Sequence, residues 1–294
     1  MNRSPQPSRY ERGAGGGDRR GSPVGRPPRS PGPQGNHLRP QSDSGQGRDF
    51  ARPRTPEPEL PDDLTADLAD RSIHRELRTL SKENAEGVAR HLLAVSELVD
   101  RGDIDRALEH ALTATRRAGR VPIVREMLGV VHYRRGEWAK ALAEFRTARR
   151  LSGSHHLLPL MADCERGLGR PERAIELGRG SEVASLRAAE RIELALVVAG
   201  ARADLGQTDA AVHQLAQLTR TVRDDQAWAA RVYYAYAGAL SSQGQHEAAS
   251  QWLRRAARFD TEQATDAAVR LGLVAQEPAP VDPIGEVLDL AEND

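Results

Sequence analysis

The sequence predicts an all-α protein in which a helix–turn–helix unit recurs along most of the chain. Five glycines stand at nearly regular intervals, and an alanine follows each of them five residues later. Aromatic residues make up only 4% of the 294 residues, so alanine and leucine supply most of the apolar surface. This composition suits the packing of helix on helix and differs from that of a β-sandwich.

The recurring glycines are expected to mark the turn inside each helical pair. They are separated by 34, 33, 37 and 38 residues, and they are Gly102, Gly136, Gly169, Gly206 and Gly244. The residues five places later are Ala107, Ala141, Ala174, Ala211 and Ala249. The residues seven places earlier are small or β-branched, namely Val95, Gly129, Ala162, Ala199 and Ala237. Because glycine adopts positive φ in a turn and small side chains let helices approach closely, each unit should contain one tight crossing.

The segment Met127–Arg150, MLGVVHYRRGEWAKALAEFRTARR, is the clearest copy of the unit. It resembles the tetratricopeptide repeat, a helical pair of about 34 residues, through Leu128, Gly129, Gly136, Trp138, Ala141, Phe145 and Ala148. It departs from the family pattern at His132, where tyrosine is usual, and at Arg125, where tryptophan is usual. A further stretch, Met161–Leu177, resembles an actinobacterial group of such proteins.

This resemblance implies a right-handed, tetratricopeptide-like α-solenoid of about five helical pairs. The folded body is expected over residues 62–276, with repeats near 88–120, 122–154, 155–184, 190–224 and 226–260. Capping helices are expected at 62–82 and 261–274, because the ends of such an array need their apolar faces covered. The third repeat should be degraded, since Gly178 replaces a large residue and Glu176–Val183 should shorten its second helix.

Both flanks of the body are expected to be disordered. Residues 1–61 form an arm rich in proline, glycine and arginine, with no periodic apolar residues to offset the entropy of ordering. Residues 277–294 form an acidic tail that contains three prolines and no basic residue. Within this tail, Ile284, Val287 and Leu288 have the spacing of one short amphipathic turn.

In tetratricopeptide arrays the first helix of each pair lines a concave groove. Carrying that geometry over gives a candidate partner-binding set of Ile123, Glu126, Val130, Tyr133, Arg134, His156, Asp163, Arg166, Leu196, Arg231 and Tyr234. Tyrosine and arginine are among the residue types that most often dominate interfaces. We therefore expect a non-catalytic scaffold or adaptor whose partner is a protein or peptide that the sequence does not identify.

An alternative function is a nucleic-acid-associated adaptor that uses the arm. Residues 1–54 contain eleven arginines against four acidic residues, which gives a local charge of about +7 although the whole chain is formally neutral. Arginine interleaved with glycine binds RNA or an acidic protein surface through charge and stacking. Only Tyr10 and Phe50 are available in this region for stacking on bases.

Catalysis, cofactor binding and metal binding are not expected. No serine stands in a nucleophile elbow, and Gly13–Gly17 lacks the flanking strand and helix of a phosphate loop. His155 and His156 are adjacent and would point about 100° apart on a helix, which suits no shared metal ion. The single cysteine, Cys164, and the lack of a long apolar run predict a cytoplasmic protein with no membrane span.

Overall fold

The chain folds into consecutive helices, and a computed structural model describes residues 56–273 of them. Within this range the ordered elements are all helical and run as η1 (Ala66–Leu68), α1 (Arg71–Leu77), α2 (Lys82–Asp100), α3 (Ile104–Ala118), α4 (Pro122–Arg134), α5 (Trp138–Ser152), α6 (Leu158–Gly167), α7 (Pro171–Leu177), η2 (Ser181–Ser185), α8 (Ala188–Asp204), α9 (Thr208–Thr221), α10 (Ala229–Ser242), α11 (His246–Phe259) and α12 (Ala267–Arg270). The predicted all-α solenoid is confirmed.

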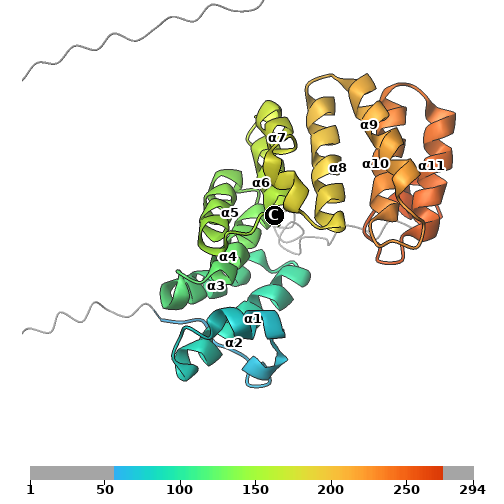
Figure 1. Cartoon of the computed structure of the whole chain (residues 1–294). Coiled ribbons are helices and arrows are strands. Elements are labelled where there is room, and N and C mark those ends of the chain that lie inside the picture. The colour runs from blue at the N-terminus through green and yellow to red at the C-terminus, as the bar shows by residue number, and fades with distance from the viewer. Residues whose placement is uncertain (1–55, 274–294) are drawn as a thin grey trace, which may run out of the picture. The chain divides into compact units, whose positions relative to one another are not determined.

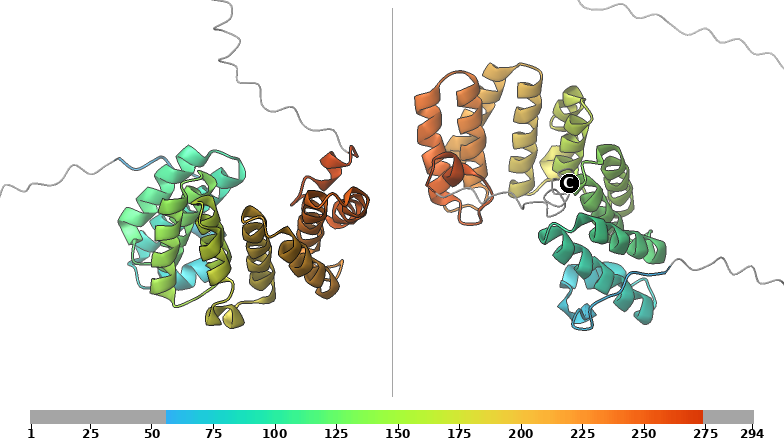
Figure 2. Two further views of the ribbon diagram at one scale, coloured as in Figure 1. Left: turned by 90° about the horizontal axis from the view of Figure 1, so that it is seen from above. Right: turned by 180° about the vertical axis from the view of Figure 1, so that it is seen from behind.

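Five helical pairs form the array, and Figure 1 shows them in chain order. The pairs are α2 with α3, α4 with α5, α6 with α7, α8 with α9, and α10 with α11. Each second helix also packs on the first helix of the next pair, and successive first helices such as α6 and α8 are in contact. Two further views show the same order of pairs (Figure 2).

The turn glycines and their crossing partners behave as the sequence predicts. All five turn glycines have positive φ, between 69° and 79°. The alanines five residues later are buried, as are the small residues seven residues earlier. A close crossing lies in the second pair, where Phe145 of α5 covers Gly129 of α4. A Cβ atom added at Gly129 would lie 2.6 Å from the Phe145 ring.

The second helix of the third pair is short, and α8 of the next pair packs against its end. Its second helix, α7, ends at Leu177, and the chain continues through Gly178 into η2. A Cβ atom added at Gly178 would lie 2.4 Å from the Cγ2 atom of Val198 on α8. The glycine therefore lets α8 pack closely against the end of α7. The equivalent positions of the second, fourth and fifth pairs carry the large side chains Phe145, Leu215 and Leu253.

The flanking helices are shorter than the sequence predicts. The region 62–82, where one or two capping helices are expected, contains two short elements, η1 and α1, because residues after Leu77 turn and Ser81 is extended ahead of α2. The expected helix at 261–274 is reduced to α12. Asp260 accepts hydrogen bonds from the backbone nitrogens of Ala264 and Thr265 at 2.7 and 2.8 Å, and these bonds hold the chain in a turn.

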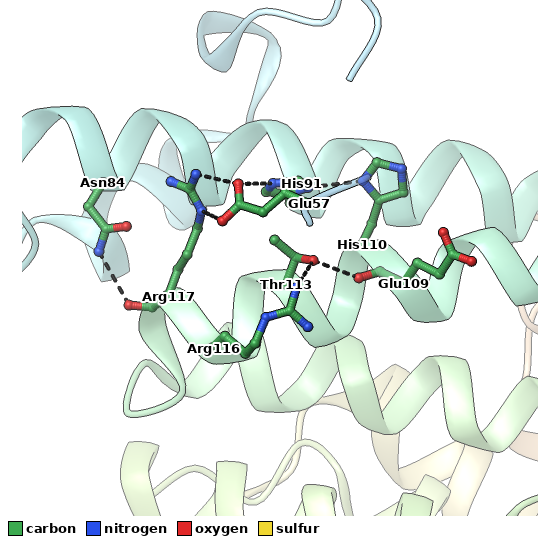
Figure 3. A network of polar contacts seen from close by, with 8 residues as sticks. All are labelled: Glu57, Asn84, His91, Glu109, His110, Thr113, Arg116 and Arg117. Atoms are coloured by element: carbon green, nitrogen blue, oxygen red, sulfur yellow. Dashed lines mark hydrogen bonds and ion pairs between the residues drawn. The ribbon is translucent and has the colours of Figure 1, made fainter. Parts of the chain in front are cut away.

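The segment 56–61 contacts the body, although its composition places it in the predicted arm. Glu57 accepts two hydrogen bonds from Arg117 of α3, at 2.9 and 2.5 Å. The Glu57 carboxylate also lies 3.7 Å from Nε2 of His91 on α2. His91 in turn contacts His110 of α3, and Figure 3 shows this network. The rest of the predicted arm, up to residue 55, and the predicted tail, 277–294, lie outside the described residues.

Candidate partner-binding site

Four successive first helices line one open cavity of about 490 Å³, which we call the inner groove. The helices are α4, α6, α8 and α10, the first members of the second to fifth pairs. The lining residues are Tyr133, His156, Pro159, Leu160, Asp163, Arg166, Ala189, Glu190, Glu193, Leu196, Val197 and Arg231. The walls thus combine apolar side chains with three carboxylates, two guanidinium groups and one imidazole.

The groove face of α8 follows from helical periodicity. Ala189, Glu193, Leu196 and Val197 are spaced by four, three and one residues, so they share one side of the helix. The opposite side of α8 carries Leu194 and Val198, which are buried in the core with α6 and α7. The core therefore fixes which side of α8 faces the groove.

A chain of polar contacts crosses from α4 to α8. The hydroxyl of Tyr133 donates to Asp163 on α6 at 2.5 Å. Arg166 donates to Asp163 at 2.9 Å and to Asp204 on α8 at 2.8 Å. Burial and the hydrogen bond to Asp163 raise the pKa of Tyr133. The bonds to Asp204 and Asp163 raise the pKa of Arg166, so its positive charge is already paired.

Two other ion pairs line the same surface. His156 lies 2.9 Å from a carboxylate oxygen of Glu126 on α4, and this hydrogen bond raises the pKa of His156. Arg231 on α10 donates to Glu193 at 2.5 Å. Burial raises the pKa of Glu193 despite the opposing effect of Arg231.

Six of the eleven predicted residues line the inner groove together: Tyr133, His156, Asp163, Arg166, Leu196 and Arg231. Glu126 borders the groove through His156. Ile123 and Val130 are partly buried and pack on core clusters, so much of their surface is used within the array. Tyr234 packs on the last core cluster, and its hydroxyl accepts a hydrogen bond from Arg270. Arg134 is exposed and does not line the cavity.

Sequence reasoning missed Glu190 and Glu193, which supply two of the three carboxylates of the groove. Their spacing with Ala189 and Val197 is the signal that could have identified them. Within residues 56–273, no three histidine, cysteine, aspartate or glutamate side chains come together in a way that could hold a metal ion. No helix in the described part of the chain is long and apolar enough to cross a membrane.

Comparison with known proteins agrees with this architecture. Residues 92–156 match the sequence profile of the tetratricopeptide repeat, and no curated protein matches the chain. TTC0263, a thermophilic tetratricopeptide protein of Thermus thermophilus, has a TM-score of 0.52 at 21% identity, over 63% of this chain and 97% of that one. The Cut9–Hcn1 complex of the APC/C also gives 0.52, at 15% identity, over 69% of this chain and 39% of that one. Residues 92–156 therefore carry tetratricopeptide repeats, and the described part of the chain folds as a solenoid of helical pairs similar to those structures.

Proposed function

We propose that this chain is a non-catalytic adaptor that binds a protein or peptide partner in the inner groove. The observation that carries this proposal is the cavity of about 490 Å³ to which four successive first helices contribute. Solenoids of stacked helical pairs generally serve as scaffolds for protein interaction, because stacking creates an extended binding surface. A peptide that spans α4 to α10 would contact every pair from the second to the fifth.

The charges of the groove indicate how such a partner would be held. Both lining guanidinium groups, Arg166 and Arg231, already face carboxylates, and Glu190 accepts a hydrogen bond from the backbone nitrogen of Arg187. We therefore expect apolar contacts with Leu160, Leu196 and Val197 to supply most of the affinity. The charged groups would mainly fix the orientation of the peptide, since such pairs give specificity more than affinity.

An exposed alanine gives a direct test of this surface. Ala189 lies on α8 at the groove, so Ala189→Trp fills part of the cavity without adding charge. We expect this variant to fold normally and to capture its partner from native lysate about tenfold less well, a loss of about 1.4 kcal/mol. Ala143 is an exposed alanine on α5 that does not line the groove, so Ala143→Trp is the matched control. Equal capture by both variants would overturn the proposal.

The nucleic-acid alternative rests on the arginines of residues 1–54. It predicts that affinity falls steeply with salt, because neutralised phosphates release counterions. Removing residues 1–54 separates the two functions, since a groove-bound partner should still be captured by the shortened chain. Loss of all captured material after this truncation, together with steep salt dependence, would favour the nucleic-acid function.

A further inference from the structure

A second hollow lies at the C-terminal end of α10, away from the residues that line the inner groove. It consists of two adjoining cavities of about 440 and 130 Å³ that share Gly238, Ser241 and Arg270, and we call it the α10 furrow. The larger cavity extends between α8, α9 and α10, and the smaller one lies between α10 and α11. Figure 1 shows α10 between these neighbours.

The furrow is open because α10 presents small side chains there. A Cβ atom added at Gly238 would meet nothing within 4 Å, so this position is not filled by the core. Alanine, glycine and serine line most of the furrow, and Leu215 and Leu253 add larger apolar surface. A small-residue surface of this kind accepts a short apolar segment at close range.

The charge of the furrow distinguishes it from three other hollows of the described body. Each of those is lined by three carboxylates and by two or three lysine or arginine side chains, so the charge of its lining is −1 or 0. No carboxylate lines either cavity of the furrow. Its one guanidinium group, Arg270, donates to the hydroxyl of Tyr234 at 3.0 Å and has no carboxylate partner among residues 56–273. The furrow therefore favours an apolar segment that carries negative charge.

We propose that the furrow binds the chain's own C-terminal segment, residues 284–290. This segment, IGEVLDL, carries Ile284, Val287 and Leu288 at helical spacing, with Glu286 before Val287 and Asp289 after Leu288. The tail from 277 to 294 has six acidic residues and no basic one, so the furrow, whose lining carries a net positive charge through Arg270, attracts it more than hollows whose lining is neutral or negative. A helix of seven residues is marginal alone in water, and an apolar surface would stabilise it.

The length of the tail allows this contact. The structure describes the chain to Leu273, three residues beyond Arg270, and 21 residues follow. Ile284 is fourteen residues beyond Arg270 and can reach at most about 50 Å from it, at about 3.3–3.6 Å per residue. A tethered segment acts at an effective concentration on the order of millimolar, so a weak contact is sufficient for substantial occupancy.

Cysteine trapping in the full-length chain tests this contact. The tail probe is Gly285→Cys, which retains every apolar and acidic residue of the segment. It is paired with Ser242→Cys in the furrow or, as the control, with Gln251→Cys, an exposed position on α11 that lines neither cavity. Native Cys164 is buried, and burial raises its pKa to about 12, so it competes poorly in the oxidation.

We expect the furrow pair to form an intramolecular disulfide at least about fivefold faster than the control pair, because docking raises the local concentration of the probe. Adding Arg270→Glu should reduce the furrow rate to that of the control, and circular dichroism should be unchanged in every variant. Equal rates for the two pairs would overturn the proposal. Disulfide-linked dimers in place of the intramolecular product would also overturn it, since they would show that the segment docks on a second copy of the chain.

Discussion

Phe145 of α5 lies against the backbone of α4 at Gly129, with no room between them for a side chain. Gly129→Ala would place a Cβ atom 2.6 Å from the aromatic ring, and Phe145 is fully buried and has little freedom to move. We expect this change to lower the free energy of unfolding by about 1–3 kcal/mol. Urea denaturation followed by circular dichroism measures the effect.

The control for this prediction is the same substitution in a helix where space is open. At Gly238 of α10, an added Cβ atom would meet nothing within 4 Å. Gly238→Ala should therefore stabilise the chain by up to about 1 kcal/mol through helix propensity alone. If the two substitutions had effects of the same sign and size, close contact at the Gly129 crossing would not be a source of stability.

The buried histidine pair should make stability depend on pH. His91 and His110 are 1% and 2% exposed, and their Nδ1 atoms lie 2.9 Å apart. One nitrogen must donate and the other accept, so the contact requires at least one neutral ring. Burial and the neighbouring His110 lower the pKa of His91 to about 4, and burial also lowers the pKa of His110.

The sign follows from proton linkage. Below the unfolded pKa of about 6.5, the unfolded histidines bind protons that the folded ones do not, so stability falls as pH falls. When the pH is lowered from about 7 to about 5.5, His91 alone should reduce the free energy of unfolding by about 1 kcal/mol. His91→Gln removes this contribution, and urea titrations of both chains at the two pH values measure it. A pH dependence that is identical in the two chains would contradict the prediction.

Glu57 should contribute measurably to the stability of the fold, although it precedes the first helix. It accepts two hydrogen bonds from Arg117, and these bonds lower its pKa. The carboxylate is 41% exposed, so Glu57→Ala should cost only about 0.2–1 kcal/mol, with less effect at high salt. Glu59→Ala is the control, because Glu59 is exposed and makes no ion pair with residues 56–273. Equal melting temperatures for the two variants would show that segment 56–61 is not held by Glu57.

The hydroxyl of Tyr133 should stabilise the fold at the inner groove. It donates to Asp163, so Tyr133→Phe leaves that partly buried carboxylate with one donor fewer. We expect a loss of about 0.5–1.5 kcal/mol in the free energy of unfolding. Tyr236→Phe is the matched control, since the Tyr236 hydroxyl has no hydrogen-bond partner among the described residues. A comparison of the two variants by thermal melting separates the hydrogen bond from the ring, and equal losses would contradict this role.

The repeat register could be predicted because its causes are local. A positive-φ turn selects glycine, and a close crossing selects alanine at a fixed distance from it, so both leave a periodic signal. The contacts of the groove have no such signal. Tyr133 and Asp163 are 30 residues apart, and Arg166 and Asp204 are 38 apart, so their pairing depends on how successive pairs stack.

The repeat pattern also does not predict single contacts between residues that are far apart in the sequence. Glu57 meets Arg117 across 60 residues, whereas composition alone assigns Glu57 to the arm. The repeat pattern indicates a defect in the third repeat at Gly178. In the structure, the absence of a side chain at Gly178 makes room for Val198 of the next pair. In both cases the position of the residue is explained by a contact with a residue distant in the sequence, which local periodicity does not identify.

Hydrogen exchange with and without the captured partner tests the central claim most directly. If the partner binds in the inner groove, peptides from α4, α6, α8 and α10 should exchange more slowly in the complex, because ordered contacts suppress local opening. Peptides from α5, α7, α9 and α11 should change little. Protection confined to the second helices or to residues 1–54, with the first helices unchanged, would contradict the account.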